Sequence, residues 1–247
     1  MCGRIALYTD PDRMARILGA GLADRTVADW QPSWNVAPTR SIFGVSESKG
    51  RRMLDQYRWG LVPSWVKDPK TVTSTFNARA ESLASKPMFR SAFQSRRILI
   101  PVDEFYEWET LGPKLKQPYA FRRSDGEPIV MAGLREWNPD LDGGGRTATI
   151  ITTQAGPDMP IHNRQPVVLE RDVWDHWLDA EVTDPDELES LLRPTVTGTL
   201  VRHPVRKDVG NVNNDGPELV EAVALEADNG QGSLWSGSHS DAGRGAP

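Results

Sequence analysis

Short runs of apolar and β-branched residues, separated by Gly, Pro and Asp, recur along the chain and predict a protein built mainly of short strands. Strands are expected at 3–8, 42–46, 53–58, 97–102, 118–122, 128–134, 147–153, 166–169 and 199–205. Helices are expected at 11–19, 170–179, 185–192 and 217–223. Strands and helices do not alternate regularly, which argues against a doubly wound parallel sheet. The pattern favours an α+β fold, in which strongly bent, mainly antiparallel sheets form a barrel-like core with peripheral helices.

The length of 247 residues suits one large mixed domain, which we assign to residues 1–227. Residues 228–247 are rich in Gly and Ser and have little to bury, so we expect a disordered C-terminal tail. The glycines at 143–145 lie between two apolar runs. They predict a flexible hairpin tip and not a phosphate loop, because no Lys-Ser or Lys-Thr pair follows them.

The net charge of -5 argues against affinity for nucleic acid, but this charge is unevenly distributed. Residues 1–100 hold 16 Lys and Arg against 8 Asp and Glu, a balance of +8. The remaining residues hold 13 against 26, a balance of -13. This asymmetry between the two parts of the chain predicts a basic surface on an acidic protein.

The sequence offers no sign of export, membrane insertion or metal binding. No segment approaches the ~20 apolar residues that span a bilayer, and the charged N-terminus lacks the apolar centre of a signal peptide. The single cysteine cannot form an internal disulfide, which fits a reducing compartment, so we expect a cytoplasmic, nucleoid-associated protein. One Cys and four scattered His have no ligand spacing, and we expect neither metal nor cofactor.

That cysteine stands at position 2, where the small side chains of Cys2 and Gly3 favour removal of Met1. The new N-terminus would be a 1,2-aminothiol. Its amine can condense with an aldehyde to an imine, and its thiolate can then close a five-membered thiazolidine. Alternatively, the amine can act as the base for its own thiol, as in N-terminal nucleophile hydrolases. A third interpretation is a buried cysteine with a structural role only.

Three other polar residues are candidates for proton transfer or orientation. Glu107 lies between Tyr106 and Trp108, and large apolar rings would desolvate its carboxylate. His162 lies in a loop between prolines, where it can face a cleft. Asn77 can donate and accept, so it could hold the Cys2 amine or a substrate oxygen. Each also has a purely structural alternative. Glu107 could be a solvent-exposed strand residue, His162 a surface histidine and Asn77 a turn residue.

Several motifs occur in an order that points to one family. They are Met1-Cys2-Gly3-Arg4, Trp34 to Thr39, Arg58 to Trp65, Asn77-Ala78-Arg79-Ala80-Glu81, Arg97 to Pro101, Phe105-Tyr106-Glu107-Trp108, Ala132-Gly133-Leu134, Thr152-Thr153 and Met159 to Pro166. Over residues 2–225 the sequence resembles the SRAP (SOS response-associated peptidase) family, whose members crosslink to abasic sites in single-stranded DNA. The class II glutamine amidotransferases also begin Met-Cys-Gly, but their early Asn-Gly element is missing here.

The resemblance implies the SRAP fold and assigns roles to residues. The implied active site consists of Cys2, Asn77, Glu107 and His162. The implied phosphate contacts are Arg4, Arg79 and Arg164, and the residues that stack on or wedge between bases are Pro38 and Trp65. We expect Trp30, Trp174 and Trp177 to pack in the core instead.

The implied activity is a covalent thiazolidine crosslink between Cys2 and the ring-opened aldehyde of an abasic site, which shields the lesion. Self-processing at the N-terminus is a further implication of the resemblance, and a self-contained domain of this size is expected to act as a monomer. Noncovalent binding should be weak and salt-sensitive, given the net charge. Two alternatives remain: a thiol protease that uses Cys2 with His162, and a non-catalytic reader of modified DNA for which Cys2 would be dispensable.

Overall fold

The computed structural model describes residues 2–23, 30–68, 70, 72, 74–141 and 145–225. Strands dominate these residues and helices are few, so the expected α+β class is confirmed. The predicted tail at 228–247 lies outside the described residues, as do two of the three glycines at 143–145. Gly145, the third glycine, has a left-handed φ of 68°.

The larger sheet curls into a closed ring. Its strands, in spatial order, are β12 (Arg164–Pro166), β11 (Arg146–Gln154), β10 (Ile129–Trp137), β7 (Arg97–Val102), β4 (Ser41–Ser48), β5 (Arg51–Trp59) and β2 (Gly21–Leu22), and β6 (Asn77–Arg79) pairs with β11. The ring closes because β5 pairs with β11 as well as with β4. Three of the described pairs in this sheet are parallel: β5 with β11, β6 with β11, and β2 with β5. The other described pairs are antiparallel.

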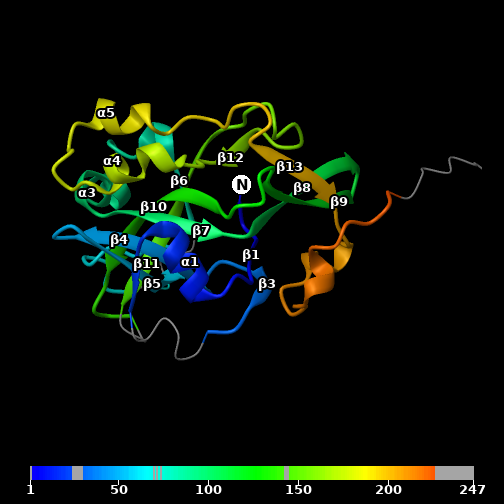
Figure 1. Ribbon diagram of the computed structural model, residues 1–247, viewed down its shortest axis with the longest axis horizontal. Helices are drawn as coiled ribbons and strands as arrows, with labels where there is room; N and C mark the ends of the chain where they lie inside the picture. The colour runs from blue at the N-terminus through cyan, green and yellow to red at the C-terminus, as the bar shows by residue number, and fades with distance from the viewer. Residues whose placement is uncertain are drawn as a thin grey trace, which may run out of the picture.

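The smaller sheet is entirely antiparallel and places the start of the chain at the centre of the molecule. Its spatial order is β13 (Leu200–Pro204), β9 (Leu115–Arg123), β8 (Glu104–Gly112), β1 (Ile5–Leu7) and β3 (Ser33–Val36). Strand β1 therefore pairs on both sides, with β8 and with β3. In Figure 1, β1 lies between the ring on the left and β8, β9 and β13 on the right.

The helices are short and lie on the periphery. Their bounds are α1 (Pro11–Leu18), α3 (Pro87–Ser95), α4 (Trp174–Leu178) and α5 (Pro185–Ser190). Helix α1 begins as the sequence predicts, because the Asp10 side chain accepts hydrogen bonds from the backbone N–H groups of Asp12 and Arg13. It ends at Gly19, whose φ of 62° suits a residue without a Cβ.

Several expectations about local structure were wrong or incomplete. The helix expected at 170–179 is a 3-10 turn, Arg171–Val173, followed by the short α4, and the helix expected at 217–223 is only the 3-10 turn Pro217–Leu219. Of the strand expected at 166–169, Pro166 ends β12 (Arg164–Pro166) and Val168 forms an isolated antiparallel bridge with Met131. Helix α3 and strands β2, β3, β6 and β8 were not predicted; further 3-10 turns occur at Ala80–Ser82 and Lys207–Gly210.

One buried arginine links β7 to helices α3 and α4. Arg97 is 4% exposed, and its guanidinium donates to backbone carbonyl oxygens of Trp177 at 2.6 Å, Phe93 at 2.8 Å and Val182 at 3.0 Å. Two more carbonyls, those of Gln94 and Asp179, complete the set. As predicted, Trp174 and Trp177 are buried, and Trp30 packs against the core beside Phe43.

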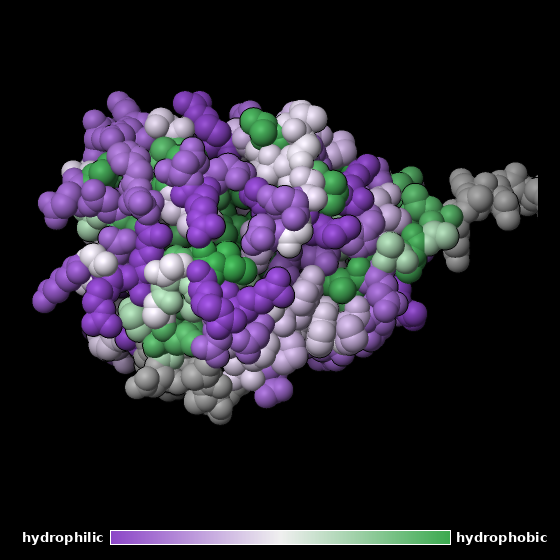
Figure 2. All heavy atoms as spheres, in the orientation of Figure 1, coloured by the Kyte–Doolittle hydropathy of each residue, from purple (hydrophilic) through white to green (hydrophobic). Residues whose placement is uncertain are grey.

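The surface seen in Figure 2 is largely hydrophilic, with apolar residues in separate patches. Among the residues that the structure describes, no helix has both the length and the apolar character required to cross a bilayer.

Candidate functional site

Cys2 and Asn77 meet at the centre of the molecule. Cys2 precedes β1 and is fully buried. The Asn77 side-chain Nδ2 donates a 2.6 Å hydrogen bond to the backbone carbonyl oxygen of Cys2. The Asn77 Oδ1 is also buried, and within the described residues it has no hydrogen-bond partner. A buried acceptor of this kind is prepared to receive an N–H group.

Strand pairing explains why Asn77 lies there. The three residues of β6 run parallel to β11, with Asn77 opposite Ile150 and Arg79 opposite Thr152. Two hydrogen bonds from β11, one before and one after Asn77, hold the strand: the backbone N–H of Ile150 donates to the Phe76 carbonyl, and the Thr152 hydroxyl donates to the Ala78 carbonyl. Asn77 and Arg79 therefore project from the same face, two residues apart.

Glu107 approaches the same cysteine from the smaller sheet. It lies opposite Tyr119 in the pairing of β8 with β9 and is 4% exposed, so its predicted burial is confirmed. The predicted cause of its burial was wrong, however. Tyr106 and Trp108 pack in a second, smaller apolar cluster on the opposite face of β8, because successive side chains of a strand alternate.

The Cys2 thiol is strongly held in its neutral form. Burial raises its pKa far above the usual range, and the nearby charge of Glu107 raises it further. A backbone hydrogen bond from Arg4 acts in the opposite direction but is a smaller effect. The thiol therefore needs a proton acceptor before it can react, and Glu107 is the carboxylate whose charge it feels.

His162 precedes β12, the strand that pairs with the other side of β11. Its Nδ1 accepts a 3.0 Å hydrogen bond from the backbone N–H of Arg164. The same Nδ1 lies 3.2 Å from the carbonyl oxygen of Arg164, an acceptor that suits the other tautomer, so both backbone groups of Arg164 hold the ring. Strands β6 and β12 both pair with β11. The loop that carries His162 and the strand that carries Asn77 are therefore both connected to β11.

Arg164, a predicted phosphate contact, already has an anionic partner. Its Nη1 and Nη2 donate to the two oxygens of Glu81, each at 3.0 Å, and its Nη2 also donates to the Thr152 carbonyl at 2.6 Å. These bonds with Arg164 lower the pKa of Glu81, and the charge of Arg79 contributes less. Arg79 is exposed, so the two arginines and Glu81 form one charged cluster.

Arg4, another predicted phosphate contact, is largely buried. Its Nη1 donates to Asn35 Oδ1 at 2.7 Å and to the carbonyl of Val209 at 2.6 Å. Its guanidinium lies 5.9 Å from the Trp108 ring, and burial lowers its pKa. These contacts tie the N-terminal strand to residues 207–215, so in this structure Arg4 also has a structural role.

The two predicted base contacts differ in exposure. Trp65 is 59% exposed, on a turn that Asn138 anchors by donating from Nδ2 to the carbonyls of Pro63 at 2.6 Å and Val66 at 2.8 Å. Pro38 is half-buried beside a cavity of about 150 Å³. The next residue, Thr39, has a φ of 79°, which is rare for a β-branched residue. The exposed indole of Trp65, on a turn that Asn138 holds in place, is suited to stacking on a base.

The structure thus brings Cys2, Asn77 and Glu107 together and groups His162, Arg79 and Arg164 along β6, β11 and β12. Sequence reasoning missed the residues that hold these groups. They are Asn35, Glu81, Asn138 and Thr152. Asn35, Glu81 and Thr152 all lie within the motifs that carry the family resemblance, so a signal was available for them, whereas Asn138 gave none.

Comparisons with known proteins agree on one family. The family model described as SOS response associated peptidase (SRAP) matches residues 1–212. The abasic site processing protein YoqW of Bacillus subtilis is 38% identical over 226 residues, covering 90% of this chain and 100% of the relative. YedK of Escherichia coli, with the same description, is 32% identical, covering 90% of this chain and 100% of the relative. HMCES of Xenopus tropicalis is 31% identical, covering 91% of this chain and 79% of the relative.

Solved structures show the same fold. A Bacteroides thetaiotaomicron protein superposes with a TM-score of 0.80 at 24% identity, covering 90% of this chain and 100% of the other. A phage-related protein from Bordetella bronchiseptica gives a TM-score of 0.65 at 26% identity, covering 83% of this chain and 95% of the other. The motif order, the fold and the extent of these matches together show that this chain belongs to the SRAP family.

Proposed function

We propose that this protein binds single-stranded DNA and, after loss of Met1, forms a covalent thiazolidine between Cys2 and the ring-opened aldehyde of an abasic site. The observation that carries this proposal is the 2.6 Å hydrogen bond from Asn77 to the Cys2 carbonyl, in a buried site where Glu107 acts on the thiol. The descriptions of YoqW, YedK and HMCES as abasic site processing proteins support the same substrate.

The raised pKa of the Cys2 thiol supports an order of events in which the amine reacts first. A neutral amine is a nucleophile without losing a proton to a base beforehand, whereas a neutral buried thiol is a poor one. The unpartnered Oδ1 of Asn77 supplies an acceptor for the amine N–H, again within the described residues. Asn77 would then hold both the carbonyl and the amine of Cys2.

The chemistry proceeds in two stages. The amine nitrogen bonds to C1′ of the aldehyde, Glu107 in its acid form donates a proton to the resulting hydroxyl, and loss of one water leaves a protonated imine and the Glu107 carboxylate. The Cys2 sulfur then bonds to the same carbon, the electrons of the carbon–nitrogen double bond return to nitrogen, and the thiol proton passes to Glu107. The net change is aldehyde plus aminothiol to thiazolidine plus one water, and it requires no redox partner. Holding amine, thiol and aldehyde together accounts for much of the rate.

His162 is assigned to the sugar oxygen. The imidazole, which the backbone of Arg164 holds at Nδ1, can act as acid or base on that oxygen as the sugar ring opens. The same groups allow the reverse reaction by microscopic reversibility. Arg4, Arg79 and Arg164 are assigned to phosphates and Trp65 with Pro38 to the bases, so that the lesion is placed over Cys2.

The protease alternative is weaker on these observations. Cysteine nucleophiles in proteases carry a lowered thiol pKa beside an imidazolium, whereas burial and Glu107 raise the pKa here. A peptide-cleavage assay with abasic DNA as competitor distinguishes the two. Cleavage that needs Cys2 and is indifferent to DNA would favour the protease.

The decisive experiment uses a single-stranded oligonucleotide with one abasic site and a denaturing gel. The wild-type protein should give a shifted band, with an intact mass equal to protein lacking Met1 plus DNA minus one water. A tetrahydrofuran analogue, which has no aldehyde, should give none. Cys2→Ser should give only a less stable product that borohydride can trap.

The same gel excludes the rival interpretations. An identical band from Cys2→Ala would refute the mechanism, as would a crosslinking protein that retains Met1. Binding without any covalent product would favour the non-catalytic reader. Addition of a chelator should leave the rate unchanged.

A further inference from the structure

The loop at 155–163, which joins β11 to β12 and carries His162, is held at both of its ends. The backbone N–H of Ala155 donates to the carbonyl of Asn163 at 3.1 Å, which closes the base of the loop. Within it, the N–H of Met159 donates to Gly156 at 3.1 Å, and the Met159 side chain is buried.

A buried glutamine fixes the first turn of this loop. Gln165 is fully buried; its Oε1 accepts a 2.6 Å hydrogen bond from the N–H of Gly156, and its Nε2 donates to the Thr195 hydroxyl at 3.1 Å. The approach is close, because a Cβ on Gly156 would lie 2.7 Å from the Thr195 carbonyl oxygen. The loop therefore packs closely against the segment at 194–200, with no room for a side chain at Gly156.

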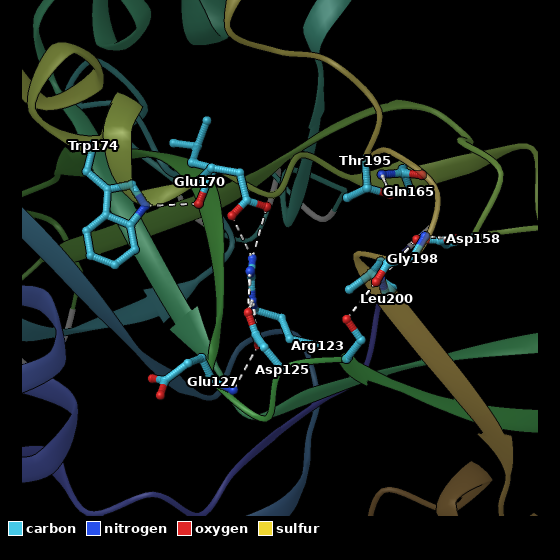
Figure 3. Close-up of polar contacts among 12 residues, drawn as sticks. Arg123, Asp125, Glu127, Asp158, Gln165, Glu170, Trp174, Thr195, Gly198 and Leu200 are labelled. Atoms are coloured by element: carbon cyan, nitrogen blue, oxygen red, sulfur yellow. Dashed lines mark hydrogen bonds and ion pairs between the residues drawn. The ribbon is translucent and has the colours of Figure 1, made fainter.

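An aspartate makes a second connection to that segment. Asp158 accepts from the N–H of Gly198 at 3.0 Å with Oδ1 and from the N–H of Leu200 at 2.9 Å with Oδ2. Figure 3 shows this pair of bonds beside the contact between Gln165 and Thr195. Both carboxylate oxygens are used, so Asp158 is set in orientation as well as in position.

The segment leads directly into the sheet that carries Glu107. Leu200 starts β13 and lies opposite Arg123 of β9, and β9 places Tyr119 opposite Glu107 of β8. Arg123 makes a further connection between β9 and the segment that follows β12. Its guanidinium binds both Asp125 and Glu170, and Glu170 belongs to that segment (Figure 3). The chain of bonds from Gln165 and Asp158 thus connects the loop of His162 to the strand of Glu107.

We propose that Thr195, Gln165 and Asp158 are positioning residues that fix His162 relative to Glu107, so that the two groups act on the same sugar. This inference rests on the proposed function, which assigns proton transfer to both. These three residues lie outside the site, and we expect them to set the rate of the covalent step and not the affinity for DNA.

The test compares Thr195→Val, which removes the hydroxyl at nearly constant volume, with Thr195→Ser, which keeps it. The crosslinking rate is measured at saturating abasic DNA across pH 5 to 9, and the Kd is measured with the tetrahydrofuran analogue. Thr195→Val should slow crosslinking about tenfold, change the shape of the pH–rate profile and leave Kd within about twofold. Thr195→Ser should restore the wild-type rate, and Asp158→Asn tests the second connection in the same way.

A double-variant cycle separates positioning from general damage. In a His162→Ala background, Thr195→Val should cause no further loss of rate. An equal loss in both backgrounds, a parallel rise in Kd, a wild-type rate in Thr195→Val or a His162→Ala variant as fast as wild type would overturn the inference. Absence of any crosslink from the wild-type protein would instead refute the proposed function.

Discussion

The side chain of Asn77 and the backbone carbonyl of Cys2 are joined by a 2.6 Å hydrogen bond, although Asn77 lies in the larger sheet and Cys2 precedes β1 of the smaller one. Asn77→Asp replaces the donor by an acceptor and adds a negative charge beside a thiol that already resists ionisation. We expect the crosslinking rate to fall about 100-fold. Gel-based rates check this, with the exposed Asn213→Asp as matched control. A variant within twofold of wild type would exclude the role of Asn77.

The carboxylate of Glu81 occupies the two guanidinium nitrogens that a phosphate would use on Arg164. Glu81→Gln removes this competitor. The affinity for the tetrahydrofuran analogue should rise about threefold to tenfold at low salt, and the slope of log Kd against log salt should steepen by about one unit. Fluorescence anisotropy over a salt series measures both, with the exposed Glu221→Gln as control. Unchanged affinity and slope would show that Arg164 does not meet a phosphate.

Glu104 gives the folded protein a pH dependence of its own. Burial raises its pKa to about 7, with Asp103 adding to the effect, while the hydrogen bond from Tyr8 opposes it. The unfolded chain loses this proton near pH 4.5. Between these two values the folded state alone keeps the proton, so the free energy of unfolding should fall as the pH rises from 4.5 to 7 and then level off.

Glu104→Gln keeps the acceptor for Tyr8 and cannot ionise. At pH 8 it should be more stable than wild type by roughly 2 kcal/mol, and at pH 4 the two should be equal. Urea unfolding at several pH values measures the difference. The exposed Glu127→Gln should follow the wild-type curve. A constant offset between Glu104→Gln and wild type at every pH would contradict the assignment.

Arg97 should be among the most sensitive positions in the core. Arg97→Lys retains the charge but loses the planar fork that serves carbonyls on α3, α4 and the segment after α4. Buried carbonyls are then left without donors, and the free energy of unfolding should fall by about 3 kcal/mol. Denaturant unfolding measures this, and the exposed Arg90→Lys on α3 should change stability little. Equal stability of the two variants would refute the structural role of Arg97.

The sequence alone predicted most strands of the ring and the beginning of α1, because their apolar runs and the Asp10-Pro11 pair are local signals. Strand β8 escaped prediction because Glu104 and Glu107 are buried on opposite faces, which breaks the alternation that marks a half-buried strand. Strand β6 has only three residues, too few for any periodicity. Helix α3 did carry a signal, since Phe89, Ala92 and Phe93 have helical spacing.

The predicted site residues came from motif order, and the contacts between them came from the fold. The hydrogen bond between Asn77 and Cys2 spans 75 positions, and the pair of Arg164 with Glu81 spans 83. No local pattern encodes such distances. The roles of His162 and of the DNA contacts stay predictions until they are measured.

The central position of β1 also bears on how the protein is made. Its partner β8 begins about a hundred residues later, at Glu104, so β1 cannot dock until that part of the chain has left the ribosome. At ~5–20 residues per second, this leaves the N-terminus accessible for roughly 5–20 s of synthesis. Under the proposed function, the enzymes that remove Met1 therefore have a defined interval on the nascent chain before folding encloses Cys2.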